Sequence, residues 1–103
     1  MSGFALHPEA FKDLEEIWDF IAVDSLAAAD GVIEEIYEAI RALVPFPQVG
    51  HGRADLSSRP LRFHPVRSFP IAYAPDETPL VVIAVLHGRR SPRVMAAILR
   101  GRE

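Results

Sequence analysis

The sequence predicts an α+β fold in which a hairpin of two helices packs on one face of a small antiparallel sheet. Through residues 8–43, and again after residue 91, apolar residues recur every three or four positions, as on one face of a helix. Through residues 61–86 they alternate with polar residues or run without interruption, as in strands. Half of the 103 residues are apolar, which is enough for one core, so we expect a single domain over residues 1–103.

The first elements are a short strand and two helices. Phe4–Leu6 is predicted to be a strand that pairs at one side of the sheet. The sequence HPE at residues 7–9 favours a helix start, because proline fits the first helical position and an acid complements the helix dipole. This helix should end near Val23. Asp24 or Ser25 can cap a second helix, which should end before the proline-containing stretch PFPQVG, so an antiparallel helical hairpin is expected.

The second half predicts a meander of strands and a last helix. PFPQVGHGRADLSSRP, residues 45–60, is rich in proline, glycine and serine and is predicted to be a surface loop. RPLRFHPV alternates apolar with polar residues, and FPIAYA and LVVIAVL follow it after turns at RS and PDETP. These segments predict three antiparallel strands. The SP pair at residues 91–92 can begin a short C-terminal helix that ends at Gly101.

Charge is divided between the two parts of the chain, whose net charge is −3. Residues 1–40 carry ten acidic side chains and one base, whereas residues 41–103 carry ten arginines and four acids. This division favours an anionic partner or nucleic acid at the basic part, although a solvated surface without a partner gives the same pattern. Arginine binds carboxylate or phosphate through a planar fork but almost never transfers a proton. The basic part therefore suits binding better than acid–base catalysis.

Histidine and arginine gather where the last predicted strand ends, in the sequence LHGRR. If the strands of the meander that carry such residues were neighbours, these side chains would converge near one end of the sheet. The arrangement would fit a metal-independent nuclease, with histidine moving protons and arginine holding phosphate, or a docking surface. Spacing alone leaves both open. The residues of the nuclease alternative are Arg62, His64, His87 and Arg90.

Other classes of site find no support in the sequence. No two histidines have the spacing of a metal site, and no glycine-rich phosphate loop is present, so we expect neither a metal nor a cofactor. The absence of cysteine excludes disulfides and favours a reducing compartment. The N-terminal stretch lacks a secretory pattern, and the longest apolar run, LVVIAVL, is too short to cross a bilayer. We therefore expect a cytoplasmic protein without a membrane partner.

Over nearly the whole chain, the order of elements and four stretches resemble the ParE/RelE superfamily of bacterial toxins. The stretches are HPEAFKDLEEIWDFIA, RALVPFPQVGHGR, IAYAPD and VLHGRRSP, and within them IWDFIA and VLHGRR together point to the ParE branch. The resemblance implies a toxin of a bacterial type II toxin–antitoxin pair, which a small ParD-like antitoxin silences. ParE-like members typically poison DNA gyrase, whereas RelE-like members cleave messenger RNA on the ribosome.

Two features separate this chain from RelE-like nucleases. Those proteins have an arginine directly before the aliphatic pair and tyrosine of the middle strand, where this chain has Pro70 before Ile71, Ala72 and Tyr73. They also have a tyrosine or histidine in the C-terminal tail, and the tail SPRVMAAILRGRE contains neither. We therefore expect a protein inhibitor of gyrase with no catalytic residues and no direct binding of nucleic acid. The messenger RNA endonuclease is one alternative, and a ParE-like toxin with a target other than gyrase is the other.

The resemblance implies two binding surfaces. The antitoxin should lay apolar residues beside the helical hairpin and carboxylates against the arginines. For the two aromatic residues of the hairpin, Trp18 and Tyr37, packing in the core is the alternative role. The residues expected to bind the antitoxin are Trp18, Tyr37, Arg53, Arg62, Arg67, Arg89 and Arg90. Those expected to bind the target are His87, Arg89, Arg90 and Arg93. Arg90 could also brace the C-terminal segment.

Overall fold

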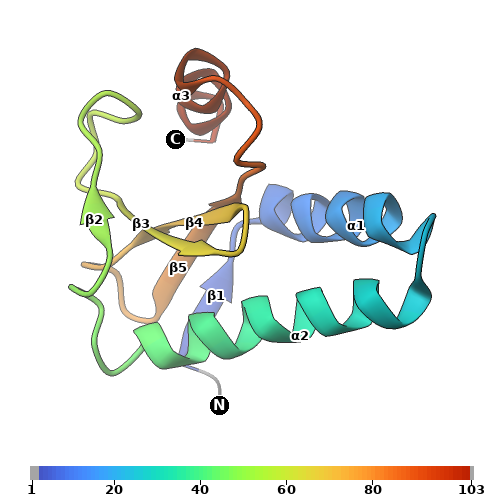
Figure 1. Ribbon diagram of the computed structural model, residues 1–103. Coiled ribbons are helices and arrows are strands. Elements are labelled where there is room, and N and C mark those ends of the chain that lie inside the picture. Colours follow the sequence, from blue (N-terminus) through green and yellow to red (C-terminus); the bar gives the residue numbers. More distant parts are fainter. Residues whose placement is uncertain (1–2, 103) are drawn as a thin grey trace.

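The computed structural model describes residues 3–102 and confirms the predicted α+β class, with a helical hairpin beside a mixed sheet (Figure 1). The sheet has the order β1-β5-β4-β3-β2. β1 runs parallel to β5 at one edge, and the other neighbouring strands are antiparallel. The elements are β1 (Phe4–Leu6), α1 (Pro8–Ala22), α2 (Leu26–Leu43), β2 (His51–Gly52), β3 (Arg62–Val66), β4 (Phe69–Ala74), β5 (Leu80–Val85) and α3 (Pro92–Arg100).

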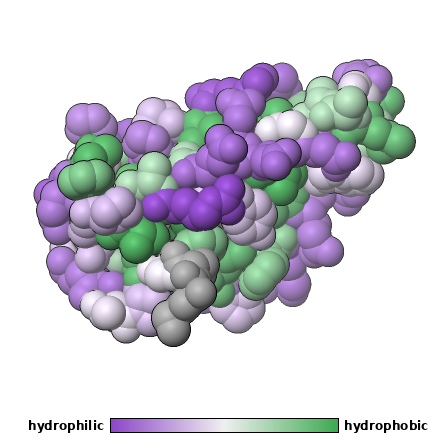
Figure 2. All heavy atoms as spheres, turned by 90° about the horizontal axis from the view of Figure 1, so that it is seen from below, coloured by the Kyte–Doolittle hydropathy of each residue, from purple (hydrophilic) through white to green (hydrophobic). Residues whose placement is uncertain are grey.

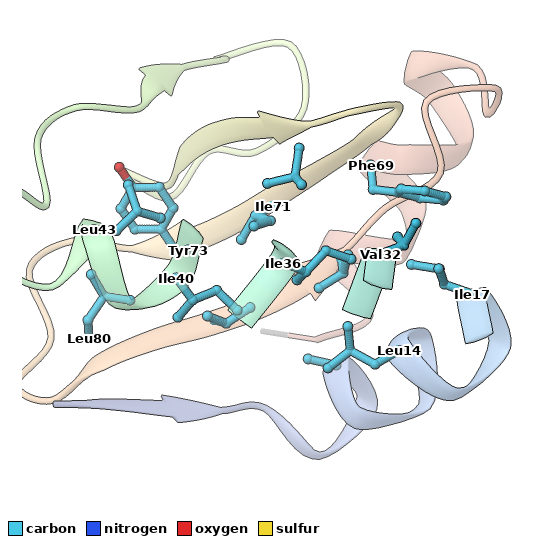
Figure 3. Close-up of a cluster of buried hydrophobic side chains, with 14 residues drawn as sticks. Leu14, Ile17, Val32, Ile36, Ile40, Leu43, Phe69, Ile71, Tyr73 and Leu80 are labelled. Carbon is cyan, nitrogen blue, oxygen red and sulfur yellow. The ribbon is translucent and has the colours of Figure 1, made fainter. Parts of the chain in front are cut away.

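Side chains cap both helices of the hairpin where the sequence predicts helix starts. His7 Nδ1 accepts a hydrogen bond of 3.0 Å from the backbone N–H of Glu9, and Ser25 Oγ accepts one of 3.1 Å from the N–H of Ala28. These bonds satisfy N–H groups that have no partner inside the helix. The apolar stripes of α1 and α2 then face the sheet and form the larger core with it (Figure 3). Its members include Leu14, Ile17, Val32, Ile36, Ile40, Leu43, Phe69, Ile71, Tyr73 and Leu80.

A second core covers the opposite face of the sheet, which the sequence alone does not predict. Met95 and Leu99 of α3 pack there with Leu56 and Leu61 of the long loop and with the outward side chains of β3, β4 and β5. Because β4 and β5 lie between two layers, their side chains are buried on both faces. This burial explains why FPIAYA and LVVIAVL are apolar almost throughout.

The segment between α2 and β3 is held against the sheet by one buried hydroxyl. Tyr73 Oη accepts a hydrogen bond of 2.9 Å from Gly50 N and donates one of 2.8 Å to the carbonyl of Pro47. The prediction of an uninterrupted loop over residues 45–60 is wrong at His51–Gly52, which pair with β3 as the edge strand β2. Two residues are too few to show an alternating pattern, so periodicity could not reveal this strand.

Candidate functional site

The sequence HGRR forms the connection between β5 and α3, at the end of the sheet where the β3–β4 turn also lies. Gly88 N donates a hydrogen bond of 2.6 Å to the carbonyl of Ser68 in that turn. A Cβ atom at Gly88 would stand 2.7 Å from the same oxygen, so only glycine fits without movement of the backbone. Ser91 then caps α3 by accepting a hydrogen bond from Val94 N. The arginines between Gly88 and Ser91 are therefore held by fixed backbone at both ends.

His87 is enclosed by two aromatic rings. Its ring centroid lies 5.5 Å from that of Phe20 on α1 and 5.1 Å from that of Phe69 on β4, both in edge-to-face arrangements. Burial, followed by the charges of Arg89 and Arg90, lowers the pKa of His87 below its ordinary value of 6.5. Its buried Nδ1 has no hydrogen-bond partner among the described residues. The lowered pKa favours the neutral form of His87, whose ring packs against the two aromatic rings in this arrangement.

Arg89 and Arg90 present their charges beside α1. The guanidinium carbon of Arg89 lies 5.5 Å from the ring centroid of Phe20, within the range of a cation–π interaction. Phe20 itself is 53% exposed. Arg89 and Arg90 are both exposed, and within residues 3–102 neither forms an ion pair. Together with Phe20 they form what we call the basic turn surface.

A pocket of about 240 Å³ lies next to this surface, between α1, the end of β5 and α3. Its wall is mainly apolar, but two carboxylates of α1 also contribute to it. The lining residues are Asp13, Glu16, Ile17, Phe20, Val85, Leu86, His87, Arg90 and Ile98. The pocket could receive one apolar side chain of a partner, next to the cation of Arg90.

A partly buried ion pair holds Asp13, which lines this pocket, and no local pattern in the sequence predicts it. Arg102 donates through both terminal nitrogens to the carboxylate of Asp13, at 2.5 and 2.8 Å, and Val85 N donates to the same carboxylate at 2.9 Å. Arg102 also donates to the carbonyl of Ile83 at 3.1 Å. The bonds to Asp13 raise the pKa of Arg102. In this structure Arg102, rather than Arg90, braces the C-terminal segment against α1 and β5.

The predicted site residues fall into two groups at opposite ends of β3. Arg62 is at the start of β3, opposite Tyr73, and donates a hydrogen bond of 2.6 Å to the carbonyl of Gly50. Arg53 follows β2 at the same end and pairs with Asp55. Arg67 lies at the other end, in the β3–β4 turn, and pairs with Glu35 of α2 at 2.6 Å.

The expected convergence of histidine and arginine is therefore wrong for Arg62. The convergence required that β3, which carries Arg62 and His64, lie next to β5. In the sheet β4 lies between these two strands. Arg62 is at the end of the sheet away from His87. His64 lies opposite Ile71, and Ile71 lies opposite Val85, which is two residues before His87. His87, Arg89 and Arg90 share one turn, and Arg93 follows them on α3.

The two aromatic residues expected to bind the antitoxin are half-buried within the hairpin layer. Trp18 Nε1 donates a hydrogen bond of 2.8 Å to Asp30 and so links the two helices. The ring of Tyr37 lies 6.3 Å from that of Phe4, between centroids, and it packs against the larger core. Both side chains therefore have structural contacts, and their outer edges remain accessible to a partner.

Two features are absent from the described residues 3–102, a metal-binding cluster and a membrane-spanning helix. Residues 3–102 contain no cluster of three histidine, cysteine or carboxylate side chains that could hold a metal ion. Of the helices that the structure describes, none is long and apolar enough to cross a membrane.

Comparison with known proteins assigns the chain to a family. A family model described as the ParE toxin of the type II toxin–antitoxin system, parDE, matches residues 4–92. This range begins at β1 and ends where α3 begins, so it includes the basic turn surface. A search of curated proteins gives no match. Because the family model covers most of the chain, the protein belongs to the ParE toxin family of type II toxin–antitoxin systems.

Proposed function

We propose that this protein inhibits bacterial growth by binding DNA gyrase in the cytoplasm, and that a small ParD-like antitoxin neutralises it. The observation that carries the proposal is the basic turn surface of a ParE-family chain. Arg89 and Arg90 have no carboxylate partner in the described part of the chain, and they stand beside the exposed ring of Phe20. Arginine and aromatic side chains on a rigid support are typical of the residues that dominate binding energy in protein interfaces.

The end of the hairpin extends this surface with apolar side chains. Val23 is 84% exposed and Leu26 is 63% exposed, on either side of the turn between α1 and α2. Viewed from below, the end of the hairpin carries hydrophobic surface (Figure 2). With Phe20 they offer a partner apolar contact next to the cations of Arg89 and Arg90. A protein partner can bury such a surface, whereas a small substrate needs a concave site.

The same residues support binding over RNA cleavage. Cleavage requires a base for the 2′-hydroxyl, an acid for the leaving oxygen and a cation on the phosphate, and loss of one proton carrier typically costs about 10² to 10⁴ in rate. His87 is enclosed by rings and its pKa is lowered, while Arg62 is hydrogen-bonded at the far end of the sheet. No specific contact favours the endonuclease, which we keep as an outcome of the test below.

For the antitoxin we propose an acidic and apolar segment that engages the hairpin and the arginines. Arg53 and Arg67 already have exposed carboxylate partners, so a competing carboxylate gains little there. The guanidinium group of Arg62 is bonded to a backbone carbonyl. These contacts support Arg89 and Arg90 as the main cations for the antitoxin as well. The antitoxin would then silence the toxin by covering the surface that binds the target.

The proposal is tested by adding the purified protein to two reactions, gyrase supercoiling and translation on ribosomes. Supercoiling should fail while messenger RNA stays intact. Arg90→Ala should restore supercoiling, whereas Arg41→Ala, which removes an exposed arginine of α2, should not. Ribosome-dependent cleavage that His64→Ala abolishes would instead establish the endonuclease. A toxic preparation that affects neither reaction would indicate another target.

A further inference from the structure

α3 covers the face of the sheet opposite the acidic hairpin, and beyond its C-terminal end Arg102 reaches Asp13 of α1 (Figure 1). The segment 87–102 contains five arginines and no acidic residue. Arg93 and Arg100 of α3 are exposed, and within residues 3–102 neither forms an ion pair. On the neighbouring loop the carboxylate of Asp55 is neutralised by two bonds from Arg53, of 2.9 and 2.7 Å. Because Arg102 is paired with Asp13, the uncompensated positive charge of this face comes, among the described residues, from Arg93 and Arg100.

The two free arginines of α3 form a line beside a polar depression. Seven residues make nearly two helical turns, so Arg93 and Arg100 lie on the same side of α3, about 10.5 Å apart along its axis. The residues between them on this side are Ala96 and Ala97, whose small side chains do not project beyond the helix backbone as far as the arginines do. Arg100 and Ala96 also line a depression of about 240 Å³ with the loop of residues 54–58, which contributes Ser57, Ser58 and the carboxylate of Asp55 that is paired with Arg53.

We propose that this face, made by Arg93, Arg100 and the serine loop, binds the phosphate backbone of duplex DNA. Arginine and serine side chains are among the usual ligands of backbone phosphates, and these contacts need no apolar centre. That the ligand carries phosphate groups is argued from the residues of this face alone. That the ligand is duplex DNA rests on the proposed gyrase target, because gyrase holds duplex DNA. The proposal departs from the expectation, based on the sequence, that nucleic acid is not bound directly.

The distribution of apolar residues favours a polyanion over a protein at this face. Large exposed apolar side chains lie on the hairpin and just after α2, and on α3 the single one among the described residues is Val94, which is 41% exposed. Protein interfaces need a buried apolar or aromatic centre, which the hairpin offers and α3 does not. Where α1 meets the end of α3, Arg102 neutralises Asp13. Acidic groups of the hairpin that lie farther than about 8 Å from the arginines are screened at physiological salt, so they do not prevent DNA binding.

The family comparison does not predict this surface. The family model ends at residue 92, so Arg93 and Arg100 lie outside the matched range. The bond between Arg102 and Asp13 fixes the C-terminal end of α3, and Ser91 caps its start. The two arginines are thus presented by a helix that is anchored at both ends and that lies beyond the range matched by the family model.

The test compares two double charge reversals that have the same net charge. Arg93→Glu with Arg100→Glu alters the proposed face, and Lys12→Glu with Arg41→Glu alters exposed residues of the hairpin. Binding to a labelled duplex of about 20 base pairs is followed by fluorescence anisotropy between about 50 and 200 mM salt. The wild type should bind with a log–log salt slope of about −2 or steeper, since each phosphate contact contributes about −0.9.

The α3 variant should bind the duplex at least about tenfold more weakly at the lowest salt, and the magnitude of its log–log salt slope should fall by about 2. The hairpin variant should keep the affinity and the salt slope of the wild type. Circular dichroism checks that each variant is folded, and Arg93→Gln with Arg100→Gln replaces the first variant if it is not. Three results would overturn the proposal: no binding by the wild type, equal loss in both variants, or competition by polyglutamate as effective as that by unlabelled duplex. The last would assign the face to an acidic protein. None of these results involves gyrase, so they leave the proposed target to its own test.

Discussion

Replacing Arg102 by methionine should destabilise the protein strongly, although the residue lies next to the end of the chain. Methionine keeps much of the apolar stem and removes the guanidinium group. The carboxylate of Asp13 would then keep one bond of 2.9 Å, from Val85 N, and lose both bonds from Arg102. A charge that is largely removed from water would thus be left without its counter-ion.

The size of the effect follows from burial. The side chains of Arg102 and Asp13 are 12% and 13% exposed, so the pair is closer to a buried pair than to a surface pair. Removing one partner of a buried pair costs about 3–5 kcal/mol, and the remaining exposure reduces this to roughly 2–4 kcal/mol. Domains of this size are stable by roughly 5–15 kcal/mol, so the loss is a large fraction of the total. The melting temperature should fall by roughly 10 °C or more.

Urea unfolding followed by circular dichroism measures this loss. Arg53→Met is the matched control, because Arg53 also makes two bonds to a carboxylate, Asp55, but on an exposed loop. Asp13→Asn keeps an acceptor for Val85 N, so with Arg102→Met it completes a double-mutant cycle that isolates the coupling. If Arg102→Met were no more destabilising than Arg53→Met, the ion pair would not brace the C-terminal segment.

Three further predictions concern the sheet and its turns. The pKa of His87 is lower in the folded protein than in the unfolded chain, so near pH 6.5 the unfolded chain binds more protons. The free energy of unfolding should therefore fall as the pH drops through 6.5 and level off below the pKa of the folded state. His87→Phe should remove this component of the pH dependence of unfolding. Tyr73→Phe should cost about 1–3 kcal/mol by leaving the buried N–H of Gly50 without its partner, and hydrogen exchange should accelerate in residues 45–52. Gly88→Ala should lower the melting temperature, because its Cβ would stand 2.7 Å from the carbonyl oxygen of Ser68, and an unchanged value would show that this turn adjusts freely.

Much of the fold could be predicted because its determinants are local. The proline after His7, the capping serines at residues 25 and 91, and the change of apolar period after residue 60 each act within a few residues. β2 could not be found, because its pairing depends on β3 and on the hydroxyl of Tyr73 rather than on its own two residues. The position of α3 over the second face was also hidden, since amphipathic spacing does not say which face of a sheet a helix covers.

The candidate site was predicted as a set of residues but not as a geometry. The sequence LHGRR indicated the turn that holds His87, Arg89 and Arg90, because these polar and charged residues directly follow an apolar strand. The order of strands decides which other residues join them, and this order placed Arg62 at the far end of the sheet. The partner of Arg102 is separated from it by 89 residues, and nothing in the local pattern distinguishes Asp13 from the other acids of α1.

The most direct test of the account is a titration of gyrase supercoiling with the purified protein, at a gyrase concentration well above the dissociation constant. If the basic turn surface acts by binding, supercoiling should fall linearly and end at a fixed ratio of protein to gyrase that does not change with incubation time. The double variant Arg89→Ala with Arg90→Ala, shown to be folded, should leave supercoiling unaffected at that ratio. Equal inhibition by the double variant, or no inhibition by wild-type protein that is toxic in cells, would contradict the account.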